Sequence, residues 1–279
     1  MKKFFAAAVF LFSFFPAISF SQSEIEGIIL SEEDNSPVSY ASIGVKNKAA
    51  GCVSDATGKF SLKLPISIKE TDSVIISSVG FERTGFTIAS IPQTKQIHLK
   101  ALGKILKPVV VKSHFRERNI GMKNEAFLFF RTWQGIGSGG EIGQIMRIPA
   151  GPVSIHRVRV KIDNKYDSCR VRLRIRNVVK NEPAEDLITE NIIQQIGQTT
   201  SEDNIDFDIP ENMLDLKERK VYVGFEILDA GSVDSLKHSV SFVGNEYGLH
   251  LYKSYSNSTW EWEQHFGLYI KMSLSESSD

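Results

Sequence analysis

The chain has 279 residues, and its 33 Lys plus Arg balance 33 Asp plus Glu, so it has no formal net charge. Because the chain has no net positive charge to attract anions, neither nucleic acid nor an anionic lipid surface is an expected partner. The length predicts two domains, because domains average ~100–200 residues. Each of these is long enough to bury a core.

Residues 1–22 are predicted to be a signal peptide. Lys2 and Lys3 precede an apolar run from Phe4 to Phe15, and small residues follow up to Ser21; this order is typical of an export signal. The run is shorter than the ~20 residues of a spanning helix. No later uncharged segment is longer, and no cysteine stands at the cleavage site to carry a lipid. We expect an exported protein without a membrane span, located in the periplasm, at the outer membrane or outside the cell.

Residues 23–101 are predicted to form an antiparallel β-sandwich. Short β-rich runs alternate with turn residues, and helical periodicity is absent. The runs are 25–30, 41–45, 51–54, 60–64, 74–79, 82–88 and 96–99. Turns are expected at 34–37 and 55–58, where Asp, Asn, Pro and Gly have the backbone preferences that turns need.

Five short motifs in this part stand in a familiar order. They are Gly27 in the first run, Ser-Pro-Val at 36–38, Ala-Ser-Ile-Gly-Val at 41–45, the segment 51–62 with Asp-Ala-Thr-Gly, and Ser-Ser-Val-Gly-Phe at 77–81. This order resembles the carboxypeptidase regulatory-like domain, a transthyretin-like, seven-stranded Greek-key sandwich. Cys52 and Ser54 depart from it, since threonine is more usual there. The resemblance implies a module that accompanies other domains in envelope proteins, and not a protease.

Residues 102–120 are predicted to be a linker. Residues 102–113 resemble the extended segment that follows this module in TonB-dependent outer-membrane receptors. The remaining residues are too few for a receptor barrel. The resemblance leaves open an alternative role as an accessory component of a TonB-dependent outer-membrane uptake system.

Residues 121–279 are predicted to form a jelly-roll-like β-sandwich, so the whole chain is expected to be all-β. The strand candidates are 127–131, 142–148, 155–162, 169–178, 205–209, 221–228, 240–243, 249–252 and 267–274. Residues 185–196 have mixed periodicity and fit either a helix or an irregular strand. The Gly-rich stretch 135–140 is predicted to be a loop, because its spacing does not fit a dinucleotide-binding turn.

Basic residues alternate with apolar residues along two of these strand candidates. They are Arg157, Arg159, Lys161, Arg170, Arg172, Arg174 and Arg176. A period of two places them on one face of each strand. The favoured interpretation is a solvated face, and the alternative is a binding face for an acidic glycan.

The best candidate binding site is the segment 252–263, which carries aromatic rings among Ser, Asn and Glu. The proposed ligand-binding residues are Tyr252, Tyr255, Asn257, Trp260 and Trp262. Aromatic rings with polar neighbours can stack on sugars while amides and carboxylates bond hydroxyl groups. The ligand would be an envelope glycan or protein. The alternative is that Trp260 and Trp262 point together into the core of the sandwich.

One motif suggests an enzyme. His114 and Glu117 have the H-x-x-E spacing of zinc carboxypeptidases, and His238 could be a third ligand. However, the chain lacks the alternating strands and helices of that enzyme family, and a catalytic zinc needs three placed ligands with an open position. A zinc carboxypeptidase-like hydrolase therefore remains only an alternative. We assign no catalytic residue, metal or cofactor, and expect a non-catalytic binding or structural module.

The two cysteines, Cys52 and Cys169, fall in different predicted domains and within strand-like sequence. The favoured interpretation is a buried free thiol in each domain. Export would also permit a disulfide between the domains.

Overall fold

The computed structural model describes residues 23–91, 95–103, 115–122, 129–133, 139–149, 153–210, 215–216, 219–230, 239–246 and 248–277. These residues are almost entirely β-strands and their connections, with one short 3-10 turn, η1 (Ile88–Ser90). The predicted signal peptide lies outside them. No described segment forms a helix with the length and apolar character needed to cross a bilayer.

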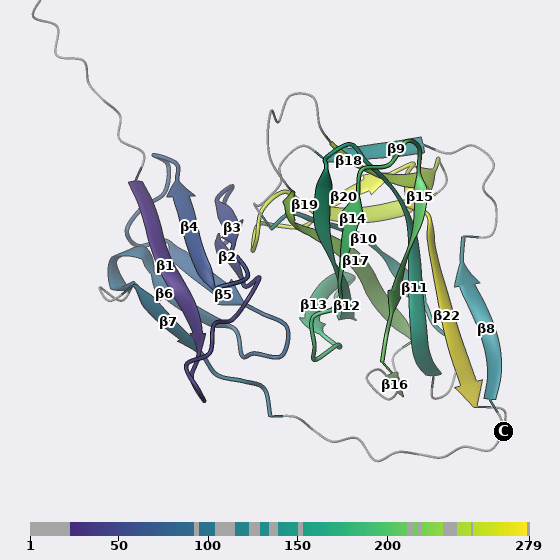
Figure 1. Ribbon diagram of the computed structural model, residues 1–279, viewed down its shortest axis with the longest axis horizontal. Coiled ribbons are helices and arrows are strands. Elements are labelled where there is room, and N and C mark those ends of the chain that lie inside the picture. Colours follow the sequence, from purple (N-terminus) through teal and green to yellow (C-terminus); the bar gives the residue numbers. More distant parts are fainter. Residues whose placement is uncertain are drawn as a thin grey trace, which may run out of the picture.

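The described residues from Ser23 to Leu99 form seven strands in two sheets (Figure 1). One sheet has the order β4-β1-β7, and the other has the order β3-β2-β5-β6. The strands are β1 (Ser23–Ser31), β2 (Ser42–Val45), β3 (Gly51–Val53), β4 (Lys59–Leu64), β5 (Ser73–Ser77), β6 (Thr84–Thr87) and β7 (Gln96–Leu99). Each overlaps a predicted run, so the all-β sandwich expected here is confirmed.

The pattern of β4 shows why these residues form a sandwich. Phe60, Leu62 and Leu64 are buried, whereas the residues between them are exposed, as a strand with one face on the core requires. The turn before β4 depends on Gly58, whose φ of 77° favours glycine. Asp55 Oδ1 accepts the N–H groups of Thr57 and Lys59. Its carboxylate therefore holds a turn.

The described residues from Phe115 to Ser277 form a second, larger sandwich. Its strands are β8 (Phe115–Gly121), β9 (Phe129–Trp133), β10 (Glu141–Arg147), β11 (Val153–Asn164), β12 (Ser168–Val179), β13 (Glu182–Asp186), β14 (Ile193–Gly197), β15 (Asp203–Asp208), β16 (Asp215–Leu216), β17 (Lys220–Ala230), β18 (Val240–Asn245), β19 (Leu249–Lys253), β20 (Glu261–Gln264), β21 (Gly267–Leu268) and β22 (Ile270–Ser277). One sheet runs β13-β12-β17-β10-β19-β20, with β14 also paired to β12. The other runs β21-β18-β11-β22-β8, with β15 and β16 paired to β11 and β9 to β18.

Two details differ from the sequence-based expectation. Residues 115–120, predicted as linker, form most of β8. This strand pairs antiparallel with β22 and extends the sheet at its edge, where the main-chain N–H and C=O groups of β22 accept another strand. The segment 185–196 contains no helix: β13 ends at Asp186 and β14 begins at Ile193. The helix alternative is therefore wrong, and the segment is the end of one strand and the start of the next, joined by residues 187–192.

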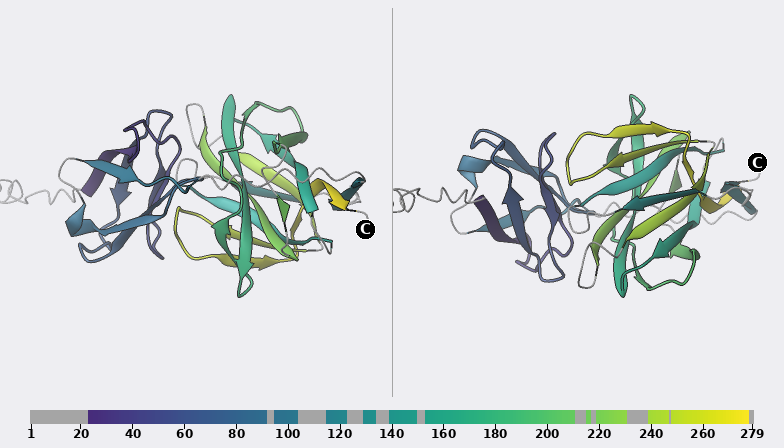
Figure 2. Two further views of the ribbon diagram at one scale, coloured as in Figure 1. Left: turned by 90° about the horizontal axis from the view of Figure 1, so that it is seen from below. Right: turned by 90° about the horizontal axis from the view of Figure 1, so that it is seen from above.

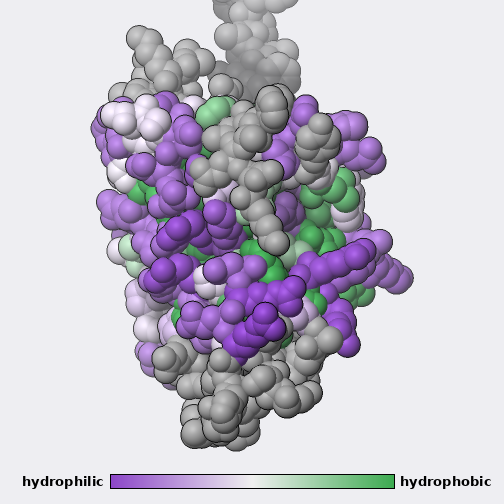
Figure 3. Space-filling model, turned by 90° about the vertical axis from the view of Figure 1, so that its right-hand side faces the viewer, coloured by the Kyte–Doolittle hydropathy of each residue, from purple (hydrophilic) through white to green (hydrophobic). Residues whose placement is uncertain are grey.

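The two sandwiches lie side by side, with β2 and β3 on the side of the first that faces the second (Figures 1 and 2). The opposite end of the molecule, around β8 and β22, is mostly hydrophilic, with smaller apolar areas between the polar side chains (Figure 3). The contact between the sandwiches is the most unusual feature of the fold, because it buries charged groups.

Candidate functional site

Buried charges cover part of the outer face of the β12-β17-β10-β19 sheet. Along β12, Cys169, Val171, Leu173 and Ile175 enter the core, and the arginines between them point to the other face. Arg172, Arg174 and Arg176 are at most 4% exposed. Glu226 of β17 and Glu141 of β10 lie beside them and are each 1% exposed.

The solvated-face interpretation is thus wrong for these three arginines and also for Lys161 of β11, which is 8% exposed. Arg157 and Arg159 do fit it, since they are partly exposed and pair with Asp206 and Asp208. Alternation identifies the face of a strand, but it does not say what covers that face. Here Arg172 is covered by the first sandwich.

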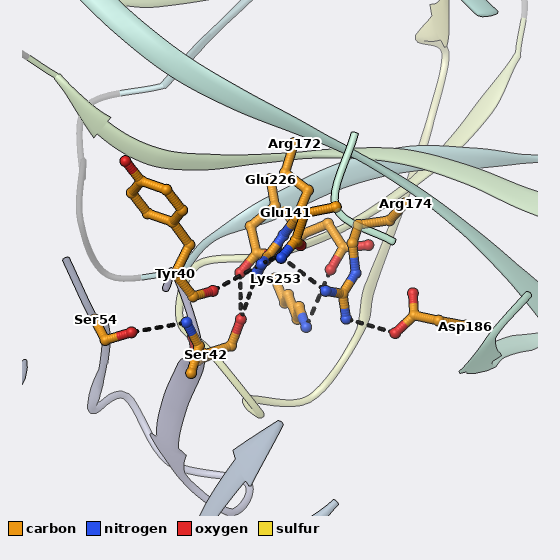
Figure 4. Close-up of polar contacts among 12 residues, drawn as sticks. Tyr40, Ser42, Ser54, Glu141, Arg172, Arg174, Asp186, Glu226 and Lys253 are labelled. Atoms are coloured by element: carbon orange, nitrogen blue, oxygen red, sulfur yellow. Dashed lines mark hydrogen bonds and ion pairs between the residues drawn. The ribbon is translucent and has the colours of Figure 1, made fainter. Parts of the chain in front are cut away.

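The centre of the contact is the pair Arg172–Glu226 (Figure 4). Arg172 Nη2 and Nε donate to Glu226 Oε2 at 2.7 and 3.1 Å. The other carboxylate oxygen, Oε1, accepts a hydrogen bond from Ser42 Oγ of β2 at 2.7 Å. Arg172 Nη1 donates to the carbonyl oxygen of Tyr40 at 2.7 Å. The ion pair belongs to the second sandwich, and the first sandwich completes its hydrogen bonds.

The other charges extend this cluster away from the first sandwich. Arg174 Nη2 lies 2.8 Å from Asp186 Oδ2, and Arg176 Nη2 lies 3.0 Å from Glu141 Oε2. Lys253 Nζ lies 3.2 Å from the same Glu141 oxygen. Buried ion pairs remain stable only when such partners compensate for lost hydration.

The cluster shifts the pKa values of its members. Burial alone would raise the pKa of Glu226, but the nearby Arg172 and Arg174 outweigh it and lower the pKa to about 2. For Lys253 burial is the largest influence and lowers the pKa, against the opposing effect of Glu141. Glu226 is therefore held ionised inside the protein.

A second contact comes from the loop after β19. Ser256 Oγ donates to the carbonyl oxygen of Cys52 at 3.3 Å, and Asn257 Nδ2 donates to that of Ile75 at 3.0 Å. The carbonyl oxygen of Asn257 accepts the N–H of Asn47 at 3.1 Å. Part of the predicted ligand segment thus binds the first sandwich.

Trp260 lies over the charged cluster, and Trp262 faces solvent. The ring of Trp260 is 5.2 Å from that of Tyr222, and Lys253 Nζ lies 4.9 Å from the Trp260 ring. Trp262 is 42% exposed on β20, opposite Leu251 of β19. Neither ring enters the core, so the alternative that both are core residues is wrong.

The two tyrosines of the predicted site lie on different parts of the chain from the tryptophans: Tyr252 points to the other face of β19 from Leu251 and Lys253, and Tyr255 lies in the loop that follows. Tyr252 is half-buried, its hydroxyl donates to Glu261 Oε2 at 2.9 Å, and the guanidinium of Arg131 lies 5.1 Å from its ring. Tyr255 is half-buried and closes a turn through its carbonyl oxygen, which accepts the Ser258 N–H. The five predicted residues therefore do not converge on one point.

Of the three residues in the zinc hypothesis, the structure describes Glu117. His114 and His238 lie outside the described residues, and Glu117 is exposed on β8. Within the described ranges, no three His, Cys, Asp or Glu residues are grouped so that they could hold a metal ion.

Both cysteines are free and buried, as the favoured interpretation predicted. Burial raises the pKa of the Cys52 and Cys169 thiols to about 12. Since the thiolate is the reactive form, we expect neither to react with Ellman's reagent at pH 8 in the native protein, and both to react in denaturant. Rapid modification of the folded protein would contradict this burial.

Comparison with known sequences decides the identity of the first sandwich. Residues 25–111 match the model of the family described as CarboxypepD_reg-like domain. The first sandwich is a CarboxypepD_reg-like domain. The match confirms the resemblance seen in the sequence and runs beyond residue 101, where the domain was predicted to end.

The whole chain has more distant similarities. No curated protein matches its sequence. Among solved structures, the cysteine protease and lectin-like domains of Cwp84, a surface layer associated protein of Clostridium difficile, are 9% identical with a TM-score of 0.35, over 92% of this chain and 59% of that one. The infectious bursal disease virus VP2 subviral particle is 14% identical with a TM-score of 0.31, over 84% of this chain and 59% of that one.

A structure of carbohydrate-binding modules from the beta-sandwich superfamily is 10% identical with a TM-score of 0.22, over 88% of this chain and 98% of that one. This chain spans only 59% of the length of the viral and Cwp84 structures. Sequence identities and TM-scores this low give no indication of function.

Sequence reasoning missed the docking of the CarboxypepD_reg-like domain on the arginine face. One signal was present: Glu226 interrupts the apolar run of β17, and register places it opposite Arg172. A carboxylate and an arginine paired in central strands indicate a face that is covered. The sequence does not contain an equivalent signal for Ser42 or Asn257.

Proposed function

We propose that this chain is a non-catalytic, exported binding protein of the cell envelope. The second sandwich would bind a glycan, and the CarboxypepD_reg-like domain would hold that sandwich in a fixed orientation. The leader-like order of residues 1–22 supports export. The family of the first sandwich supports an accessory role beside another domain.

The observation that carries the proposed glycan binding is the exposed ring of Trp262. It stands on β20, a strand at the edge of a sheet, where the backbone is fixed by pairing with β19. Leu249 of β19 is 40% exposed and pairs with Gln264, which lies two residues after Trp262 on the same face. An indole ring, an aliphatic side chain and an amide together suit the apolar faces and hydroxyl groups of a sugar chain.

Trp260 supports this face from one side. Its ring is fixed by Tyr222 and Lys253, so it adds a partly exposed aromatic surface directly before β20. A rigid aromatic surface loses little conformational entropy when it binds a ligand.

We expect Trp262→Ala to weaken glycan binding roughly thirtyfold, because truncating a central tryptophan of a binding site costs about 2 kcal/mol. Its folding stability should change by less than ~0.5 kcal/mol, since the side chain is largely outside the core. The measurement is a glycan array followed by calorimetric titration of the sugars that bind.

Ile66→Ala is the matched control, because Ile66 is 73% exposed on the other domain. It should bind like the wild type. Equal affinity of the Trp262→Ala variant and the wild type would contradict the proposed site, and binding only to envelope proteins would replace the glycan with a protein ligand.

A further inference from the structure

The two sandwiches contribute different kinds of groups to the contact between them. On the second sandwich, most of the hydrogen bonds come from side chains, namely those of Arg172, Glu226, Ser256 and Asn257, and the main-chain carbonyl oxygen of Asn257 adds one more. On the CarboxypepD_reg-like domain, the hydrogen-bonding partners are mostly main-chain groups, namely the carbonyl oxygens of Tyr40, Cys52 and Ile75 and the N–H of Asn47. Two side chains join them: the Ser42 hydroxyl, and the Tyr40 ring, whose centroid lies 5.9 Å from the Arg170 guanidinium. The hydrogen bonds of the contact therefore depend largely on where the main chain of the first sandwich lies.

Close approach of the two surfaces is possible because glycines face the second sandwich. A Cβ atom at Gly44 would overlap with the carbonyl group of Ser256, and its three nearest atoms all belong to that residue. A Cβ at Gly80 would meet the carbonyl oxygen of Thr189 at 2.6 Å. Val79 beside it belongs to the apolar cluster of the second sandwich and supplies an apolar anchor.

The charged centre of the contact does not depend on the first sandwich for its pairing. Arg172 and Glu226 lie on adjacent strands in direct register, so they stay paired if the domain leaves. The uncovered face would then be a hydrated ion pair, which is stable in water. Interfaces between domains of one chain are often polar in this way and can separate without unfolding.

We infer that the outer face of β12 and β17, with the 254–258 loop, is a preformed receptor for a CarboxypepD_reg-like domain. It holds this domain by non-covalent contacts, and the covalent connection between the sandwiches is not needed. The same face therefore accepts the CarboxypepD_reg-like domain of a second copy of the chain. This inference is independent of glycan binding.

The test starts from the folded full-length chain with a protease site inserted between Gly103 and Phe115. After cleavage, the two fragments should elute together from a size-exclusion column at low micromolar concentration. When cleaved protein is mixed with isotopically labelled cleaved protein, native mass spectrometry should find labelled first sandwich on unlabelled second sandwich. Separation of the fragments on cleavage, or lasting retention without exchange, would overturn the inference.

Gly44→Ala is the variant that tests the contact surface. The three atoms nearest to its new methyl group all belong to Ser256 of the second sandwich, so it should weaken retention of the cleaved domain about tenfold or more while leaving the fold of each sandwich intact. Gly197→Ala is the control, since no atom lies within 4 Å of its Cβ. Asn257→Ala, which removes the bond to Ile75, provides a second test from the other side. Retention unchanged by both Gly44→Ala and Asn257→Ala would refute this receptor face.

Discussion

Arg172→Ala should lower the free energy of unfolding by about 3–5 kcal/mol. The substitution leaves Glu226 buried without its main partner, and breaking a buried ion pair from one side has this effect. Arg174 does not replace Arg172, because its Nη1 lies 3.6 Å from Glu226 Oε2, too far for a hydrogen bond. Urea denaturation followed by tryptophan fluorescence measures the change.

Arg157→Ala is the matched control for this loss. Arg157 also pairs with carboxylates, Asp206 and Asp208, but its side chain is 46% exposed. Exposed ion pairs contribute at most ~1 kcal/mol, so this variant should be close to the wild type. Similar losses in the two variants would mean that Arg172 is not buried in the contact.

Acidification should destabilise the protein as the pH falls from about 4.5 toward 2. Glu226 has a folded-state pKa of about 2 against an ordinary value of 4.5. A lowered carboxyl pKa contributes stability that is fully present above the unfolded-state pKa and is lost as the pH falls through the folded-state pKa. The difference corresponds to about 3 kcal/mol. Asp186 acts in the same direction, because Arg174 and Arg176 outweigh burial and lower its pKa.

The Glu226→Gln variant shows how much of the acid-induced loss of stability comes from Glu226. The variant should be less stable at neutral pH, and its unfolding free energy should depend less steeply on pH between 4.5 and 2. Thermal unfolding at a series of pH values checks both statements. Parallel pH curves for the variant and the wild type would show that Glu226 is not the titrating group.

The first sandwich could be predicted from sequence almost strand by strand, because strands such as β4, β5 and β7 alternate buried positions with more exposed ones. Phe60, Leu62 and Leu64 show this pattern, and Gly58 marks the turn. The second sandwich was predicted as a fold class and through its longest strands. Short strands such as β16 and β20 were missed, since a few residues contain too little periodicity to distinguish a strand from a loop.

The candidate site was only partly predictable. The exposed ring of Trp262 belongs to a segment that its aromatic composition singled out. Asn257, from the same segment, contacts the other domain instead of solvent, and nothing in its local sequence indicates a partner at Ile75. The arginines of β12 show a similar limit. Their spacing gives a common face, whereas Arg172 is covered by residues of the first sandwich that lie more than a hundred positions away in the sequence.

We expect the CarboxypepD_reg-like domain and the second sandwich to dock into one rigid unit. The most direct test of this docking is a distance measurement by double electron–electron resonance between spin labels at Ile66→Cys and Val179→Cys, two exposed positions on different domains. The buried Cys52 and Cys169 should not take up label. We expect one narrow distance distribution that broadens when Gly44→Ala is added. A broad distribution without that substitution would contradict the account.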